Sequence, residues 1–211
     1  MRIHTLNLGE LGVNCYVAET APGRCIAVDV GGDSGVLLSF LEEKALRLTK
    51  ILITHGHFDH IGGVEQVRQA TDCEVYIHEL DAPMLSSTDL SLHSRMSMNR
   101  FIPVTLYTAI TGDCYLNDGG CEFRVLHTPG HSPGSVCFIC GDVIFSGDTL
   151  FRLSVGRTDF PGSSMNAMMW SMRQLAALDG DYTVYPGHGS ATRLSTERKM
   201  NPYMRRAISE R

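Results

Sequence analysis

A strand pattern that runs directly into a cluster of histidines constrains this chain more than any other feature. Residues 51–60 read Ile-Leu-Ile-Thr-His-Gly-His-Phe-Asp-His. The apolar half is short and β-branched, which predicts a buried strand over residues 51–54. The polar half offers imidazole nitrogens and a carboxylate, the groups that borderline transition metals prefer. Three histidines buried for structural reasons would each need a partner of their own, so the stretch predicts half of a metal site.

Composition places the chain among ordinary globular proteins. The 211 residues are 43% hydrophobic and 19% charged, which fits a single domain spanning residues 1–211. A net charge of −5 does not indicate a nucleic-acid surface. No apolar run approaches the roughly 20 residues that span a bilayer, and the first residues alternate like a strand rather than a signal peptide. We therefore expect a cytoplasmic protein without nucleic-acid or membrane partners; the sequence leaves its oligomeric state open.

Seven cysteines occur along the chain, and their odd number favours reduced thiols over a disulfide framework. Cys137 and Cys140 have the spacing of a redox or metal-binding pair. They lie in a strand-like segment, however, so their side chains should point to opposite faces. We expect both to pack in the core.

Strand and helix patterns alternate in two halves. The first half predicts strands at residues 1–8, 12–19, 24–30, 51–54 and 74–78, helices at 34–48 and 63–70, and a helix beginning within 81–85. Residues 86–111 form a weakly patterned connector that we expect near the mouth of the site. The second half predicts a turn-rich stretch at 116–120, strands at 121–126, 135–140, 143–145 and 183–185, and helices at 163–178 and 195–206. Two mixed sheets packed together with helices outside, an αββα sandwich, accommodate this order.

Three later loops carry the same kind of residue as the opening cluster. His131 lies in a turn rich in glycine and proline, Asp148 follows an apolar strand, and His188 follows Tyr-Pro-Gly. Each places one metal-binding side chain just beyond a strand, on a loop of restricted geometry. A single such histidine would suggest a structural role, but three loops together with the opening cluster predict a shared metal site.

The order His55-x-His57-x-Asp59-His60, then His131, Asp148 and His188, resembles the metallo-β-lactamase superfamily of metallohydrolases over nearly the whole chain. Within it the sequence is most similar to glyoxalase II-type thioester hydrolases, especially short single-domain bacterial members. Four segments carry this narrower likeness: Asn14-Cys15-Tyr16, Asp29-x-Gly31-Gly32, Gly156-Arg157-Thr158-Asp159-Phe160 and Asn201-Pro202-Tyr203. The resemblance implies the αββα fold in one domain, without a separate C-terminal helical substrate domain.

The resemblance also implies two divalent metal ions. The first would be held by His55, His57 and His131, the second by Asp59, His60 and His188, and Asp148 would bridge them. Zinc is expected, with iron or manganese as alternatives, because the donors are nitrogen and oxygen without a thiolate. Two ions roughly 3.5–4 Å apart can share a water, lower its pKa and polarise a carbonyl. Asp59 would be catalytic, orienting the bridging hydroxide, while Asp29 would either support a ligand imidazole or act as a turn or cap carboxylate.

Arg157 falls where glyoxalase II has a basic residue that helps bind glutathione, so it would pair with a substrate carboxylate. Three positions depart from that pattern: Asp159 replaces an aromatic residue, Ser190 replaces a tyrosine, and Leu153 stands where glycine is common. We expect Leu153 to alter the approach between Asp148 and Arg157. The expected substrate is a small-molecule thioester of the hydroxyacylglutathione type, with the identity of the thiol left open.

Other functions remain compatible with the sequence. A persulfide dioxygenase of the same fold would hold one Fe(II) through His55, His131 and Asp148. Lactone or phosphodiester hydrolysis is a further possibility, and a non-catalytic metal-binding protein would be the choice from a different class. The remaining histidines are expected to have ordinary structural roles: His4, His78, His93 and His127.

Overall fold

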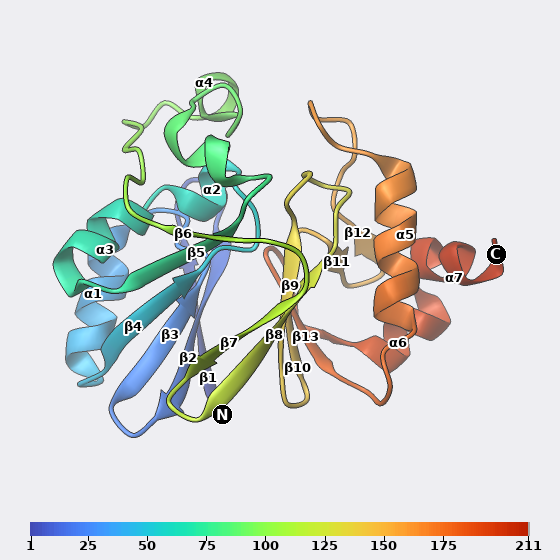
Figure 1. Ribbon diagram of the computed structural model, residues 1–211, viewed down its shortest axis with the longest axis horizontal. Helices are drawn as coiled ribbons and strands as arrows, with labels where there is room; N and C mark the ends of the chain where they lie inside the picture. The colour runs from blue at the N-terminus through green and yellow to red at the C-terminus, as the bar shows by residue number, and fades with distance from the viewer. Residues whose placement is uncertain (211) are drawn as a thin grey trace.

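Two six-stranded sheets pack face to face between two layers of helices (Figure 1). The structure is a computed structural model that describes residues 1–210. The sheet orders are β1-β2-β3-β4-β5-β6 and β14-β13-β10-β9-β8-β7, with β11 and β12 forming a separate hairpin. Both sheets contain parallel and antiparallel pairs. The predicted αββα sandwich is confirmed.

The strands and helices have the following bounds. The first sheet contains β1 (Arg2–Leu8), β2 (Val13–Ala21), β3 (Arg24–Val28), β4 (Arg47–Leu52), β5 (Glu74–His78) and β6 (Thr108–Ile110). The second contains β7 (Cys114–Asp118), β8 (Cys121–His127), β9 (Val136–Cys140), β10 (Val143–Gly147), β13 (Thr183–Pro186) and β14 (Thr192–Arg193), and the hairpin is β11 (Leu150–Phe151) with β12 (Ser154–Val155). The helices are α1 (Ser34–Glu43), α2 (Phe58–Ile61), α3 (Val64–Thr71), a 3₁₀ helix (Ala82–Ser86), α4 (His93–Met96), α5 (Met165–Ala176), α6 (Leu194–Met200) and α7 (Pro202–Ser209).

Strand alternation distributes apolar side chains over three packed layers. In β2, Val17 packs toward the helix side of the first sheet, whereas Tyr16 and Ala18 lie between the sheets. Cys137 and Cys140 divide in the same way, with Cys137 in the layer under α5 and Cys140 against the intersheet layer. Burial raises the pKa of Cys137 to about 12. The interpretation of this pair as core packing is confirmed.

Several boundaries differ from the prediction. The strand predicted over residues 51–54 begins earlier and ends at Leu52 as β4, and the connector predicted over residues 86–111 contains α4 and β6. Three other differences have a clear physical origin. The helix from Ser34 ends at Glu43, and Leu48 belongs to β4, where it pairs with Cys25. Its helical spacing from the preceding leucines was coincidental, because pairing along β3 requires an extended chain there. The stretch predicted to be turn-rich is strand β7 up to Asp118, and only the two glycines that follow make the turn.

The third difference is a break in the last predicted helix. The α6 helix ends at Met200, and the Asn201 side chain caps α7 by accepting hydrogen bonds from the backbone amides of Tyr203 and Met204. Pro202 occupies the first position of α7, where its missing N–H is not needed. Met165, expected on the buried face of α5, is 40% exposed.

The C-terminal helices hold the β11–β12 hairpin in place. Buried Glu197 accepts a hydrogen bond from the Leu153 amide at 2.8 Å, and the Asn201 side chain donates to the Ser154 carbonyl at 3.0 Å. Leu153 adopts a φ of +60°, the left-handed conformation that glycine would favour. Leucine thus makes here the left-handed turn that glycine would favour. The effect of Leu153 on the approach between Asp148 and Arg157 stays a prediction.

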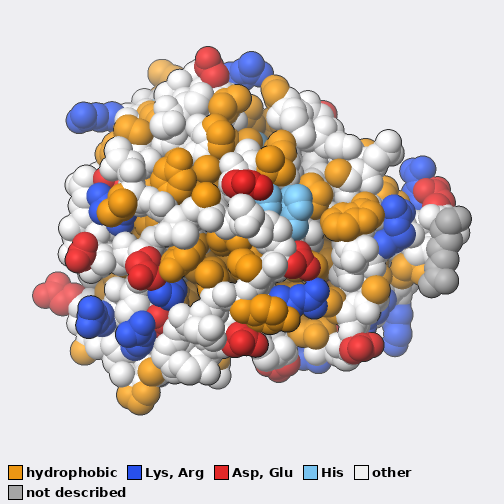
Figure 2. Space-filling view, viewed as in Figure 1, with side chains coloured by type: hydrophobic (Ala, Val, Ile, Leu, Met, Phe, Trp, Pro, Cys, Tyr) orange, Lys and Arg blue, Asp and Glu red, His pale blue; other side chains and the backbone are white. Residues whose placement is uncertain are grey.

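On the face shown in Figure 2, basic and acidic side chains are interspersed rather than gathered into a patch of one sign. No helix among residues 1–210 is long and apolar enough to cross a membrane.

Loops at the carboxyl ends of strands from both sheets meet at one edge of the sandwich. There the Val136 amide donates to the Thr54 carbonyl at 2.9 Å, and the Asn14 amide donates to the Gly187 carbonyl at 2.7 Å. These backbone hydrogen bonds cross from one sheet to the other. Loops that are distant in sequence are thereby held at a common edge.

Asp81, which sequence analysis did not single out as functional, also joins two of these loops. Its carboxylate is fully buried and accepts from the Gly56 amide (3.0 Å), the Gly134 amide (2.6 Å) and the Ser132 hydroxyl (2.6 Å). A Cβ at Gly134 would lie 2.7 Å from Oδ1 of Asp81, so only glycine permits this approach. Asp81 therefore fixes the loop after β4 against the loop between β8 and β9.

We expect Asp81→Ala to lower the free energy of unfolding by at least about 3 kcal/mol, because three buried donors would lose their charged acceptor. Urea denaturation followed by circular dichroism measures the change. Asp142→Ala, at an exposed position, is the control and should change stability by less than about 0.5 kcal/mol. Equal denaturation midpoints for the two variants would contradict this role for Asp81.

Candidate metal centre

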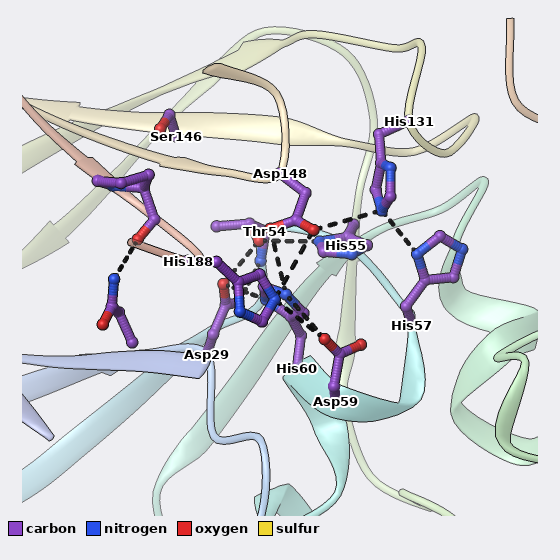
Figure 3. Close-up of polar contacts among 12 residues, drawn as sticks. Asp29, Thr54, His55, His57, Asp59, His60, His131, Ser146, Asp148 and His188 are labelled. Carbon is purple, nitrogen blue, oxygen red and sulfur yellow. Dashed lines mark hydrogen bonds and ion pairs between the residues drawn. The ribbon is translucent and has the colours of Figure 1, made fainter. Parts of the chain in front are cut away.

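The side chains predicted to bind metal converge at the edge where the loops meet (Figure 3). Their ligand atoms form three overlapping groups, each with atoms within 4.8 Å of one another. The groups are His55, His57 and His131; His55, His60 and Asp148; and Asp59, His60 and His188. All seven predicted residues therefore lie in one cluster.

These side chains lie just beyond the ends of strands or on a one-turn helix, which fixes their directions. His55 follows β4, and His57 is the extended residue before the one-turn helix α2, which carries Asp59 and His60. Asp148 follows β10 and His188 follows β13. The last two strands are parallel neighbours, so their carboxyl ends lie side by side.

The His188 loop requires a small residue before the histidine. A Cβ at Gly187 would lie 2.3 Å from Oδ1 of Asp148. The loop is held by β2, because the Asn14 side chain donates to the Pro186 and Gly189 carbonyls and the Tyr16 hydroxyl donates to Pro186. The Asn14 and Tyr16 side chains of the Asn14-Cys15-Tyr16 segment therefore position the loop that carries His188.

His57 and His131 face each other in the first group, with Nδ1 of His57 and Nε2 of His131 2.9 Å apart. The other nitrogen of His131, Nδ1, lies 2.8 Å from the Arg157 carbonyl, which can only accept a hydrogen bond. Nδ1 therefore carries the proton and Nε2 directs a lone pair at the cluster. Burial and neighbouring imidazoles lower the pKa of His57 to about 3 and that of His55 well below its usual value, so both rings are neutral donors to a metal.

Asp29 supports His60 in the second group. Its Oδ2 accepts from Nδ1 of His60 at 2.8 Å, and the carboxylate also accepts from the amide and hydroxyl of Thr54. Nε2 of His60 is thereby directed toward Asp148 and Asp59, at 3.4 and 3.7 Å. Of the two roles considered for Asp29, support of a ligand imidazole and a turn or cap carboxylate, the structure shows the first. Thr54 was missed, since in sequence it reads only as the end of a strand.

The carboxylates of the cluster are held in their charged form. Burial alone would raise the pKa of Asp148 and of Asp59, but nearby His60 and, for Asp59, the hydrogen bond from His188 lower both pKa values. His188 approaches Asp59 at 3.1 Å, and this hydrogen bond raises the pKa of His188. Burial likewise opposes charge on His60, yet the carboxylates of Asp29, Asp59 and Asp148 raise its pKa well above the usual value.

Three buried atoms of the cluster have no hydrogen-bond partner within residues 1–210: Nε2 of His55, Nε2 of His60 and Oδ1 of Asp148. Buried polar atoms are almost always paired. A bound cation would replace the proton that the carboxylates favour on His60 and would pair both imidazole nitrogens and the carboxylate oxygen. The donor set of imidazole and carboxylate without thiolate suits zinc, iron or manganese. The residues present therefore fit divalent metal ions.

A cleft of about 470 Å³ opens onto the cluster, and His57, Asp59, His131, Asp148 and His188 lie at its base. A slightly larger cavity of about 510 Å³ shares only Phe58 and Asp59 with it and contains no other residue of the cluster. The chemistry therefore belongs to the smaller cleft. Leu92 and Met96 line this cleft, so part of the connector lies at its mouth as expected.

Arg157 lies on the wall of the cleft, but its guanidinium is already engaged. Nε and Nη2 donate to the two carboxylate oxygens of Asp159, each at 2.7 Å, and the guanidinium carbon lies 4.2 Å from the centre of the Phe160 ring. Arg157 therefore lies beside the cleft, as expected, but the Nε–Nη2 edge of its guanidinium faces Asp159.

The four other histidines lie outside the cluster. His78 and His127 stack on each other with ring centres 4.2 Å apart, His4 contacts Glu19, and His93 packs near Phe101. None of the four belongs to a described group of potential metal ligands. Their expected structural roles agree with these contacts.

Comparisons with known proteins add to this geometry. The protein-family model for the metallo-beta-lactamase superfamily matches residues 8–188. The probable metallo-hydrolase YqgX of Bacillus subtilis is 36% identical over 210 residues, which cover 97% of this chain and 98% of that protein. The hydroxyacylglutathione hydrolase GloC of Haemophilus influenzae is 31% identical over 210 residues, with the same coverage of 97% and 98%.

Solved structures show the same likeness. The BLEG-1 B3 metallo-beta-lactamase superposes with a TM-score of 0.92 at 34% identity, covering 96% of this chain and 99% of that one. TTHA1623, solved in a di-iron-bound form, superposes with a TM-score of 0.85 at 38% identity, covering 95% and 99%. The chain therefore belongs to the metallo-beta-lactamase superfamily, as a metal-dependent hydrolase of that fold.

Proposed function

We propose that this protein is a binuclear hydrolase that cleaves small-molecule thioesters of the hydroxyacylglutathione type. The observation that carries the proposal is the cluster of seven side chains that could bind metal beside a cleft. Three of its buried polar atoms have no hydrogen-bond partner in the described part of the chain. Its similarity over nearly full length to a hydroxyacylglutathione hydrolase supports thioesters as the substrate class. The cleft volume suits a small molecule rather than a polymer.

The proposed ligand assignment follows the overlapping groups. His55, His57 and His131 would hold one ion, and Asp59, His60 and His188 the other. Asp148 suits the bridging position because its carboxylate reaches both halves, with Oδ2 3.6 Å from Nε2 of His131 and Oδ1 3.4 Å from Nε2 of His60. We propose zinc, with iron or manganese compatible with the same donors; the similar TTHA1623 structure contains two irons.

Two bound divalent ions would supply Lewis acidity to the thioester carbonyl and lower the pKa of a shared water. Asp59 contacts His188 and His60 through Oδ2, which leaves Oδ1 to hold the attacking water and accept its proton. Water adds its oxygen to the acyl carbon and the C–S bond breaks, which yields a carboxylate, a thiol and one proton.

His57→Ala and Asp59→Ala should each lower kcat/KM for a thioester by at least about 100-fold while the protein still folds, because each removes a proposed metal ligand. Thioester cleavage followed by thiol release, together with circular dichroism, tests this. Retention of full activity by either variant would disprove the binuclear assignment.

Asp29→Asn should weaken metal binding by about 10- to 100-fold, because the supporting acceptor of His60 loses its charge. Metal affinity is measured by competition with a chromophoric chelator. Asp72→Asn is a matched control, since Asp29 and Asp72 share the same left-handed φ of +54° and Asp72 is exposed and outside the cluster. Equal affinities in the two variants would contradict the role of Asp29.

The substrate class is tested by elemental analysis of purified protein combined with a panel of thioester, lactone, phosphodiester, β-lactam and persulfide substrates. We expect two metal equivalents and preferential thioester cleavage. One iron equivalent with oxygen consumption on glutathione persulfide would establish the dioxygenase instead. Metal binding without turnover of any substrate would indicate a non-catalytic protein.

A further inference from the structure

The wall of the cleft above the metal-binding side chains is largely apolar. Six of its side chains come from separate parts of the chain and lie around one opening: Leu11, Phe58, Met96, Phe151, Val155 and Phe160. Phe58 and Val155 are buried, so these two are fixed parts of the wall. An apolar group of a bound substrate would displace poorly held water here, whereas a charged group would lose hydration without gaining a partner.

Arg157 is the one lysine or arginine among the described residues that line this cleft. Its charge is matched by Asp159 through a two-point contact along the Nε–Nη2 edge. A substrate carboxylate would bind best along the same edge, because that geometry pairs two N–H groups with two oxygens. One face of the guanidinium lies on Phe160, whose ring is 5.4 Å from that of His57.

Asp159 therefore competes with any carboxylate that approaches Arg157. Because it lies two residues away on the same segment, it competes at a high effective concentration. Both side chains are more than half exposed, at 57% and 66%, and exposed ion pairs are weak. The competition should consequently change substrate preference by several-fold rather than by orders of magnitude.

We propose that the cleft selects thioesters whose thiol moiety is uncharged and apolar, and that Asp159 determines this preference by occupying the guanidinium of Arg157. The inference rests on the proposed thioester hydrolysis. It keeps the hydroxyacyl side of the proposed substrate and replaces glutathione by an uncharged thiol. Asp159 acts as a specificity-determining residue through Arg157 and takes no part in the bond-breaking step.

The test compares two esters with the same lactoyl group. S-lactoylglutathione carries two carboxylates in its thiol moiety, and the lactoyl thioester of N-acetylcysteamine carries none. The metal-loaded protein should have the higher kcat/KM for the neutral ester. Asp159→Asn should lower KM for the glutathione ester by about 3- to 10-fold with kcat unchanged, because Arg157 becomes available, and should leave the neutral ester within about twofold.

Two further variants isolate the effect. Glu210→Gln removes an exposed carboxylate of the Arg206–Glu210 pair at the end of α7, outside the cleft lining, and should change the rate for neither ester. Arg157→Gln combined with Asp159→Asn should lose the gain seen in Asp159→Asn alone. A preference of the unmodified protein for the glutathione ester, or equal effects of Asp159→Asn on both esters, would overturn the inference.

Failure of the proposed function gives a different result. If the metal-loaded protein cleaves neither ester, thioester hydrolysis is disproved. The binding affinities of two non-hydrolysable thioethers are then measured by calorimetry. These are S-(2-hydroxypropyl)glutathione and S-(2-hydroxypropyl)-N-acetylcysteamine. Tighter binding of only the glutathione thioether to Asp159→Asn supports the role of Asp159, and unchanged or equally changed affinities refute it.

Discussion

The structure depends on keeping a small group of imidazoles and carboxylates away from water. Nitrogens of His55 and His60 and an oxygen of Asp148 are buried without a hydrogen-bond partner among residues 1–210. Such atoms cost free energy, so the surrounding structure must hold them together. It does so with groups that are themselves fully paired: Asp29 and Asp81 each accept three hydrogen bonds, and backbone hydrogen bonds join the two sheets at the same edge. Apolar layers between the sheets and beneath the helices pack against the strands that lead to that edge.

The fold class and the cluster could be predicted because both leave local signals in the sequence. His131, Asp148 and His188 each follow a strand on a short loop containing glycine or proline, and ligand-type residues are rare at such places without a reason. Asp81 left no comparable signal. Its partners Gly56 and Gly134 lie 25 and 53 residues away, so nothing near Asp81 in the sequence shows that its carboxylate will accept from both. Its local appearance is that of a residue before a helix.

The boundary errors have a similar physical origin. Leu48 continued the helical spacing of α1, and only its pairing with β3, a contact distant in sequence, makes it part of a strand. The break before α7 differs, because Pro202 disfavours helical geometry in the residue before it and was visible as a signal. The Arg157–Asp159 contact was visible too, since residues two apart in an extended segment point to the same side.

The loop that contains Arg157 orients His131 and also lines the cleft. Different atoms of residue 157 do these two things. His131 is oriented by the backbone carbonyl of residue 157, and every amino acid has such a carbonyl. The side chain at that position points elsewhere, toward Asp159 and Phe160. Sequence drift in the loop can therefore exchange the groups that meet the substrate while the imidazole keeps its tautomer and direction. Within this fold, new substrate preferences can arise by single substitutions without an intermediate that loses the metal centre.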